Sequence, residues 1–386
     1  MVATIPQKTL PEQENDMALY DLVFEGGGAK GMAFVGALEV FKQAGHTHRR
    51  IVGTSAGAIT ATLTGAGYSP EELFTECTKT DPATGNPVFA SFMDAPVESD
   101  FTKQLIEGCE TIALMKQAGF PFSGMLENVE EKIIQALLHL ELYRELFSFN
   151  ECGGFYAGDK ALNWFRDRLV QKGMAADVTW ADFAKKTGKD VSVVTTDVTD
   201  KEMVVLNART APNVPVAESV RMSMSIPFVW REMIWKPEWG TYRLLNGSGQ
   251  MVERVKAGHI FVDGGVLSNF PLRLIALSTP DVVAVMGPTD PNGAGNLGLY
   301  LDASVMVPGA DVSDTIRPRL RAADRVTRLI DTLTDSSDLA VIRQYESSVC
   351  RLPVGGYGTT EFRMSAERQQ LLINSGKTAM QKYLAQ

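Results

Sequence analysis

The residues Gly53-Thr54-Ser55-Ala56-Gly57 place a serine between two glycines in the pattern G-x-S-x-G. A short apolar strand around Ile51-Val52 precedes the pattern, and a helix of small residues follows it to about Gly65. At a tight strand-to-helix turn the glycines make room for strained backbone, and the hydroxyl projects beside the helix N-terminus. We therefore predict Ser55 as a nucleophile for acyl transfer. A structural turn is the alternative, because the pentapeptide also arises by chance.

A second glycine-rich segment, Gly26-Gly27-Gly28-Ala29-Lys30-Gly31, follows an apolar run that predicts a buried strand. As G-x-G-x-x-G it would bind a nucleotide phosphate, but that fingerprint requires an acidic residue about 20 positions further on. The chain has His46-Thr47-His48-Arg49-Arg50 there. Alternatively, the backbone N–H groups of this segment, at the start of a helix, would form an oxyanion hole. The nearby Ser55 favours this second function. Lys30 either holds the loop, meets an anionic substrate group or is a solvated surface lysine.

A third segment, Val262-Asp263-Gly264-Gly265, ends a predicted strand with a carboxylate. Such an aspartate is more often a turn or cap residue, but the other two segments favour Asp263 as the catalytic partner of Ser55. A Ser-His-Asp triad would also need a histidine. The chain has four histidines, His46, His48, His139 and His259. Only His259 is near Asp263, and four positions along a strand separate the two by about 13 Å.

A Ser-Asp dyad is therefore the preferred interpretation, with His259 as the less favoured base. In a dyad the Asp263 carboxylate itself accepts the serine proton, which requires a desolvated site that raises its basicity. An acyltransferase of the acyl-carrier type is the alternative enzyme class, because it also has its serine in a strand-to-helix turn of this kind. That class has a histidine directly before the serine, where this chain has Thr54.

Together these segments resemble the motifs of the patatin-like phospholipases. Gly26 to Gly31 is similar to the family's oxyanion loop, Gly53 to Gly57 to its nucleophile elbow, and Asp263-Gly264-Gly265 to its D-G-[AG] motif. Ser223 to Phe228 and Val266 to Pro271 are similar to the segments that flank this aspartate. The resemblance implies a three-layer α/β/α fold, a Ser-Asp dyad, no metal or cofactor, and hydrolysis of esters in phospholipids or other acyl lipids. Some family members also need an activator.

The order of predicted elements is strand–turn–helix repeated, which is typical of a mostly parallel sheet in an α/β protein. We expect a loose tail over residues 1–18, a catalytic domain over 19–290 and a mainly helical extension packed on it over 291–386. Within the domain, residues 82–158 are turn-rich with amphipathic helices, and we expect an insertion or lid there. Residues 191–196 predict a strand paired with 203–206, and residues 282–285 predict another. Ser69-Pro70-Glu71-Glu72 predicts a capping box at a helix start.

Composition limits the partners. Among 386 residues, Lys plus Arg number 37 and Asp plus Glu 46, and no basic block occurs. We therefore expect no nucleic acid partner and only local, apolar and transient contact with a membrane surface. Four scattered cysteines lack metal-ligand spacing. Neither a signal peptide nor an apolar run long enough for a membrane span is found, so we expect a cytoplasmic or membrane-peripheral protein, with signal-independent secretion as an option.

Aromatic residues in turn-rich segments are candidates for that lipid contact. Phe89 to Met93 and Phe120 to Met125 are apolar, and Phe228 to Trp239 contains three tryptophans. Tryptophan suits the boundary between water and acyl chains. We predict lipid contact for Phe120, Phe122, Trp230 and Trp235. The alternative is that these aromatics belong to a strand packed against a neighbour.

Overall fold

A mixed β-sheet forms the centre of the protein. The structure is a computed structural model that describes residues 18–82, 84–118, 129–246, 248–288, 293–311 and 340–386. Among these residues, eight strands form one sheet in the order β12-β11-β1-β2-β4-β10-β7, with β5 paired to β4. Its strands are β1 (Leu19–Phe24), β2 (Thr47–Thr54), β4 (Asp190–Asp197), β5 (Glu202–Leu206), β7 (Met233–Ile234), β10 (Ile260–Asp263), β11 (Gly295–Met306) and β12 (Val349–Gly355).

The five strands from β12 to β4 are parallel to one another, whereas β5 and β10 run antiparallel to β4. The mostly parallel α/β fold is therefore confirmed, and so is the pairing of residues 191–196 with 203–206. In the part of the chain that is described, two smaller sheets lie outside it. They pair β3 (Gly154–Tyr156) with β6 (Phe228–Trp230), and β8 (Thr241–Leu245) with β9 (Met251–Val255).

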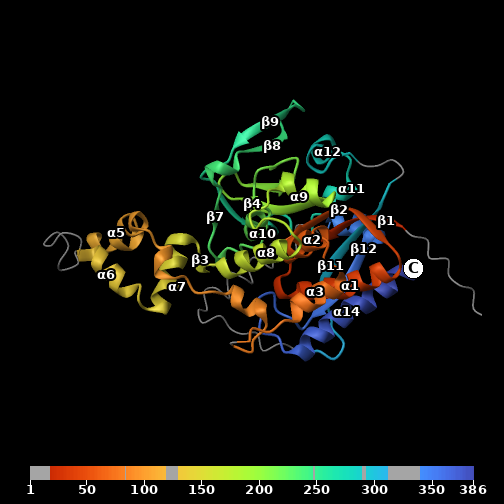
Figure 1. The fold of residues 1–386 in the computed structure, drawn as a ribbon, viewed down its shortest axis with the longest axis horizontal. Helices are drawn as coiled ribbons and strands as arrows, with labels where there is room; N and C mark the ends of the chain where they lie inside the picture. The colour runs from red at the N-terminus through yellow and green to blue at the C-terminus, as the bar shows by residue number, and fades with distance from the viewer. Residues whose placement is uncertain (1–17, 83, 119–128, 247, 289–292, 312–339) are drawn as a thin grey trace, which may run out of the picture.

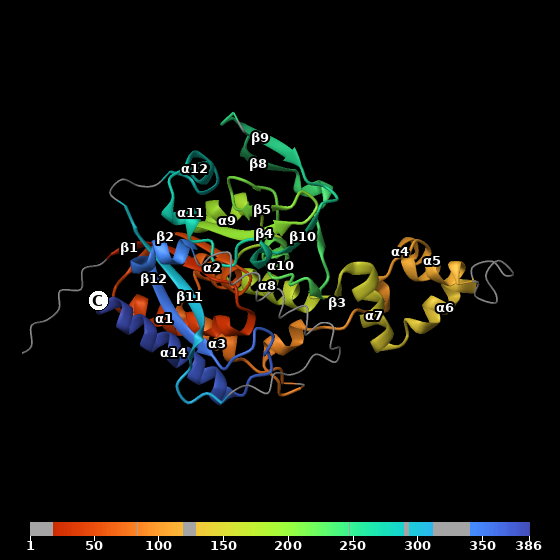
Figure 2. The ribbon, with the colours of Figure 1, turned by 180° about the vertical axis from the view of Figure 1, so that it is seen from behind.

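Helices cover both faces of the sheet, because neighbouring residues of each strand point to opposite sides. In β1, Leu22 and Phe24 join the larger core, and Val23 joins the smaller core on the other face. The helices that contribute to the larger core are α1 (Met32–Gln43), α2 (Ala56–Gly65), α3 (Pro70–Thr78), α8 (Asp159–Gln171), α9 (Trp180–Thr187), α10 (Val216–Ser223) and α14 (Ala366–Leu384). The smaller core is closed by α11 (Arg273–Ala276) and α12 (Pro280–Met286). The layers can be followed in Figures 1 and 2.

The C-terminal helix α14 lies along α1 (Figure 1). Two glycines allow this close contact. A Cβ atom on Gly36 would lie 1.9 Å from the Ile373 carbonyl oxygen, and one on Gly376 would lie 2.0 Å from that of Ala33. Any side chain at either position would push the helices apart. The contact fixes α14 against the helix that follows the glycine-rich loop.

The chain beyond residue 290 also contributes to the sheet, which the expected mainly helical extension did not include. Strand β11 pairs with β1, and β12 pairs with β11. Leu297, Leu299 and Leu301 alternate into the larger core. Conversely, the strand expected at 282–285 is part of helix α12, which begins with Pro280 in its first turn. A run of four apolar residues does not distinguish a strand from a buried helix.

Residues 82–158 contain helices as expected, but most of them project away from the sheet. The helices α4 (Lys103–Glu107), α5 (Glu110–Gln117), α6 (Val129–Leu137) and α7 (Glu141–Cys152) form an arm at one side of the molecule (Figures 1 and 2). This helical arm has its own small core around Ile134 and Phe147. The preceding short helix η2 (Val88–Phe92) instead packs against the main body through Phe89 and Phe92. In the part of the chain that is described, no helix is both long enough and apolar enough for a membrane span.

Candidate active site

The register of the sheet brings Ser55 and Asp263 to one place. Strand β2 runs parallel to β4 and ends with Thr54 opposite Val194, whereas β10 runs antiparallel and ends with Asp263 opposite Thr195. The C-terminal ends of β2 and β10 therefore meet beside adjacent residues of β4, about 3.3 Å apart along that strand. Ser55 follows Thr54 directly, and the side chains of Ser55 and Asp263 line the same cavity.

Ser55 occupies a strained turn between β2 and α2, at the position that the G-x-S-x-G pattern predicts. Its backbone has φ of 53° and ψ of −119°, and a non-glycine residue rarely adopts a positive φ except where surrounding structure imposes it. One such constraint is a hydrogen bond of 2.8 Å from the Ser55 N–H to Ser223 Oγ. Gly53 has no room for a side chain, because a Cβ atom there would lie 2.1 Å from the Gly57 carbonyl oxygen.

The end of α10 holds both candidate residues. Ser223 Oγ, which accepts the Ser55 N–H, donates to the Val194 carbonyl at 2.6 Å. Two residues later the Ser225 carbonyl accepts the N–H of Asp263 at 2.9 Å. The carboxylate of Asp263 is oriented by its own turn, because Oδ1 accepts the N–H of Gly265 at 2.7 Å. Residues 223–228 were identified only by resemblance, and the role of Ser223 has no signal of its own in the sequence.

The glycine-rich loop lies against the same cavity. Of its six residues, Gly26 donates its N–H to the Asn269 carbonyl, Ala29 to the Thr359 carbonyl and Lys30 to the Gly27 carbonyl. Within the described chain, the N–H groups of Gly27 and Gly28 donate to no other protein group. Both residues line the cavity that Ser55 and Asp263 share. The loop thus offers two unused backbone donors there.

Two residues outside the glycine-rich segment fix this loop, and one of them, Asn269, belongs to the segment Val266 to Pro271 that was identified only by resemblance. Asn269 accepts the Gly26 N–H at 2.9 Å and returns a hydrogen bond of 3.0 Å from Nδ2 to the Gly26 carbonyl. Thr359, from the segment after β12, accepts the Ala29 N–H at 2.9 Å. Gly28 has φ of 54°, and a Cβ atom there would lie 2.2 Å from the Thr359 carbonyl oxygen. Thr359 is more than 300 positions away in sequence, so no local pattern could identify it.

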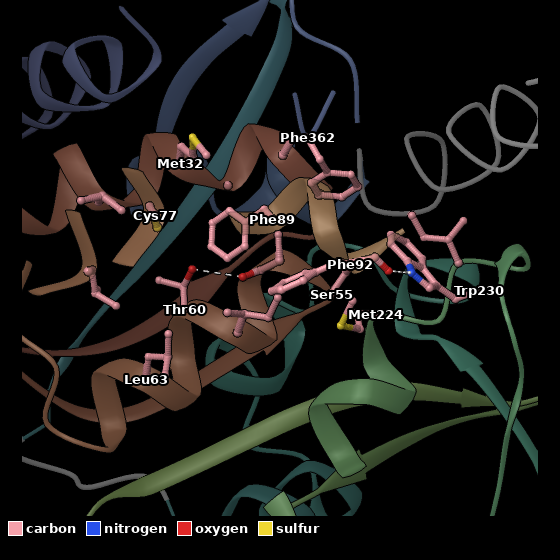
Figure 3. Close-up of a pocket in the computed structure, with 18 residues that line it drawn as sticks. Met32, Ser55, Thr60, Leu63, Cys77, Phe89, Phe92, Met224, Trp230 and Phe362 are labelled. Atoms are coloured by element: carbon pink, nitrogen blue, oxygen red, sulfur yellow. Dashed lines mark hydrogen bonds between the residues drawn. The ribbon is translucent and has the colours of Figure 1, made fainter. Parts of the chain in front are cut away.

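A second, apolar cavity opens from the other side of Ser55. Ser55, Gly28 and Ile226 line both cavities. The apolar cavity lies between α1, α2, α3 and η2, and the empty space in it amounts to about 730 Å³ when the open solvent at its mouth is counted. Figure 3 shows Ser55 among the aromatic side chains of Phe89, Phe92 and Trp230, with Leu63 and Cys77 further along the cavity. Ser55 thus lies where a polar cavity with backbone donors meets an apolar one.

This arrangement agrees with the comparison to known families, in which the sequence model described as patatin-like phospholipase matches residues 22–276. The chain belongs to the patatin-like phospholipase family. The family places it among the lipid acyl hydrolases in general. It also accounts for the coincidence of the three motifs in one cavity.

Relatives of this patatin-like chain differ in how much of it they share. It is 27% identical to the uncharacterized protein YqhO of Bacillus subtilis (strain 168), over 95% of this chain and 98% of that protein. It is 21% identical to the probable lipid hydrolase 463L of Invertebrate iridescent virus 6, over 66% of this chain and 62% of that protein. Among solved structures, VipD from Legionella pneumophila is 16% identical with a TM-score of 0.43. This chain covers 66% of VipD, while 95% of this chain is matched.

The histidines lie elsewhere in the patatin-like domain. All four are described, and none lines either cavity. His259 Nδ1 lies 2.9 Å from Asp197 Oδ2, beside a fully buried Lys256. Burial alone would lower the pKa of Lys256, but hydrogen bonds from its ammonium to Asp197, Asp200 and Glu202 raise it above its ordinary value. An ammonium group thus already balances the acidic cluster around His259.

The predicted lipid contacts have different outcomes in the patatin-like domain. Trp235 is fully buried, with its ring centroid 5.4 Å from that of Phe261 and its Nε1–H donated to the Gly240 carbonyl. Full burial contradicts the prediction of a lipid-contacting rim at Trp235, which instead packs inside the fold directly after strand β7. Trp230 is also buried, but it lines the apolar cavity and donates to the Phe92 carbonyl at 2.8 Å. Phe120 and Phe122 lie outside the described residues.

Proposed function

We propose that this protein hydrolyses carboxylic esters of phospholipids or related acyl lipids, with Ser55 as nucleophile and Asp263 as general base. The observation that carries the proposal is the position of Ser55, which lines both the polar cavity containing Asp263 and the apolar cavity. A lipid ester has the same two-part character, with a polar carbonyl and head group joined to an apolar chain. In this proposal Ser55 attacks the ester carbonyl at the junction of the two cavities.

The proposed reaction needs no group beyond these side chains, the loop and water. Asp263 accepts the Ser55 hydroxyl proton as Oγ attacks the ester carbonyl carbon. The bond to the lipid alcohol then breaks, the alcohol takes the proton from Asp263, and an acyl-Ser55 remains. In the second half, Asp263 takes a proton from water, the resulting hydroxide attacks the acyl carbon, and the fatty acid leaves as Ser55 regains its proton.

The N–H groups of Gly27 and Gly28 would donate hydrogen bonds to the carbonyl oxygen as negative charge develops on it. Preorganised donors of this kind contribute about 10²–10³ in rate each. Their freedom from internal hydrogen bonds supports this role, because a committed N–H would have to break a bond first. Of the six residues predicted for the oxyanion loop, we therefore propose Gly27 and Gly28 as the two donors. The other loop residues hold these two in place.

The position of the histidines supports a dyad. Asp263 lines the cavity with Ser55, whereas His259, the alternative base, is directed at Asp197. A carboxylate that acts alone as base requires a site shielded from water, and both Ser55 and Asp263 are about 95% buried, at 5% and 4% exposed. The substrate would have to enter from a lipid surface, so transient membrane contact is part of the proposal.

A fluorophosphonate probe tests the proposal directly. The probe reacts with an activated serine, so the native protein should be labelled at Ser55, as identified by peptide mass. Ser55→Ala should abolish labelling and hydrolysis of a phospholipid while the thermal transition changes little. Ser375→Ala is a matched control, because Ser375 is also buried but donates to the Pro353 carbonyl, outside both cavities. Hydrolysis that persists in Ser55→Ala would refute the proposal.

A further inference from the structure

The apolar cavity follows one face of helix α2. Beyond Ser55, the lining residues from this helix are Ala56, Ile59, Thr60 and Leu63. Their spacing of three and four positions is that of a single helix face. Thr60 fits this apolar wall because its hydroxyl donates to the Ala56 carbonyl at 3.0 Å within the helix. The cavity therefore extends from the nucleophile along the axis of α2.

Helix α3 closes the far part of this cavity. Leu73 and Cys77 of α3 lie one turn apart and line the cavity together with Leu63. Figure 3 shows Leu63 and Cys77 on the side away from Trp230, with Ser55 in between. Leu63 and Leu73 are each 2% exposed, so other protein groups cover both side chains. We call Leu63, Leu73 and Cys77 the floor of the cavity, because they line its part furthest from Trp230.

Cys77 belongs to this floor and not to the outer surface. Cys77 keeps some solvent-accessible surface area, yet burial raises the pKa of its thiol to about 12. These two facts agree if the accessible area of Cys77 faces the cavity, which Cys77 lines. A cysteine is also the smallest of the three floor side chains, so a larger residue at position 77 would take up more of the cavity than one at either leucine.

We infer that Leu63, Leu73 and Cys77 set the length of acyl chain that this enzyme binds, with room for about ten carbons. The eight residues from Ser55 to Leu63 span about 12 Å along a helix that rises about 1.5 Å per residue. With bonds of about 1.5 Å and tetrahedral angles, an extended hydrocarbon chain advances roughly 1.25 Å per carbon. The inference rests on the proposed function, since it assumes that the carbonyl is held at Ser55.

The cavity wall predicts how the rate depends on chain length. Each methylene group buried in an apolar cavity contributes about a fourfold gain. The specificity constant kcat/KM should therefore rise about fourfold per carbon up to about ten carbons and then level off or fall. Carbons beyond the floor would have to remain outside and would gain nothing.

Variants at the floor should move this limit in opposite directions. Cys77→Phe adds a ring to the floor and should lower the limit by at least about two carbons, while Leu73→Ala should raise it by a similar amount. Leu169→Ala is the matched control for the second change, because Leu169 is equally buried in the larger core but lines neither cavity. It should reduce stability without moving the limit.

The experiment measures competition between acyl chains. Pairs of monoacyl phospholipids with one head group and chains of 4 to 18 carbons are placed in the same mixed micelles, and released fatty acids are quantified by mass spectrometry. Competition gives kcat/KM ratios that do not depend on how much enzyme is bound or folded. Limits shifted in the expected directions support the inference. Unchanged limits in both floor variants, with normal hydrolysis of the shortest chain, overturn it. Failure to hydrolyse any chain would instead contradict the proposed function.

Discussion

Replacing Ser223 by alanine tests whether α10 maintains the strained turn at Ser55. The Ser223 hydroxyl is fully buried and makes two hydrogen bonds, one from the Ser55 N–H and one to the Val194 carbonyl. Without the hydroxyl, one buried donor and one buried acceptor lose their partner, and each such loss costs about 1–3 kcal/mol. Unfolding free energy should therefore fall by about 2–4 kcal/mol, since some relaxation is expected.

The activity of Ser223→Ala should fall more than its stability explains. The backbone at Ser55, with φ of 53°, stores about 1–3 kcal/mol of strain. In Ser223→Ala the Ser55 N–H loses its acceptor and the turn can relax. If the relaxed turn must regain this strain energy to react, kcat should drop roughly 5- to 150-fold. KM for a short soluble ester should change little, because Ser223 lines neither cavity.

A neighbouring serine on the same helix supplies the control. Ser219 is also fully buried and makes two hydrogen bonds, accepting from Trp180 Nε1 and donating to the Pro215 carbonyl, but it does not contact Ser55. The assay is kcat and KM for a short ester, beside urea unfolding of the folded variants. Ser219→Ala should lose comparable stability with nearly normal kcat, and Ser223→Thr should recover activity. Equal kcat in Ser219→Ala and Ser223→Ala would refute the role of Ser223 in positioning Ser55.

Three further predictions address the loop, a buried histidine and metal. Gly28→Ala should abolish hydrolysis and lower the melting temperature, because a Cβ atom there would clash with the Thr359 backbone at a residue with positive φ. In calorimetry, Gly27→Ala should lower the melting temperature less, because its Cβ atom would clash with the end of the Leu301 side chain. Burial lowers the pKa of His48 to about 4, so its contribution to the unfolding free energy is complete above about pH 6.5 and declines as the pH falls toward 4. In urea titrations, the unfolding free energy should therefore fall less on acidification in His48→Gln than in the native protein. Excess EDTA should leave the hydrolysis rate unchanged, since the proposed reaction uses only Ser55, Asp263 and backbone donors; a large drop would contradict it.

Local signals in the sequence predicted the elements that begin the fold. The capping box at Ser69 is present, with the hydroxyl accepting the Glu72 N–H and the Glu72 carboxylate accepting the Ser69 N–H. The strand, glycine loop and helix from Leu19 to Gln43, and the strand and helix around Ser55, also match their predictions. In these stretches the hydrophobic period and the turn residues point to the same structure, so little depends on distant parts of the chain.

Parts of the site that depend on distant contacts could not be predicted. Strand β11 was missed because its alternating leucines follow a glycine-rich stretch and have Gly298 among them, and its pairing with β1 joins residues more than 270 positions apart. Ser223, Asn269 and Thr359 act through hydrogen bonds to segments that are distant in the sequence. Trp235 was misjudged for the related reason that its burial depends on Phe261, from another strand. Residue type alone does not distinguish a buried tryptophan from one at a lipid surface.

The central claim is that Asp263, without a histidine, activates Ser55. It is tested most directly by comparing kcat/KM for a short soluble ester in Asp263→Asn, His259→Gln and the variant with all four histidines replaced. General-base catalysis is worth about 10²–10⁴ in rate, so Asp263→Asn should lose activity by that factor and approach Ser55→Ala. The histidine variants should keep substantial activity while folded. If His259→Gln alone matched the loss in Ser55→Ala, a Ser-His-Asp triad would be correct and the dyad wrong.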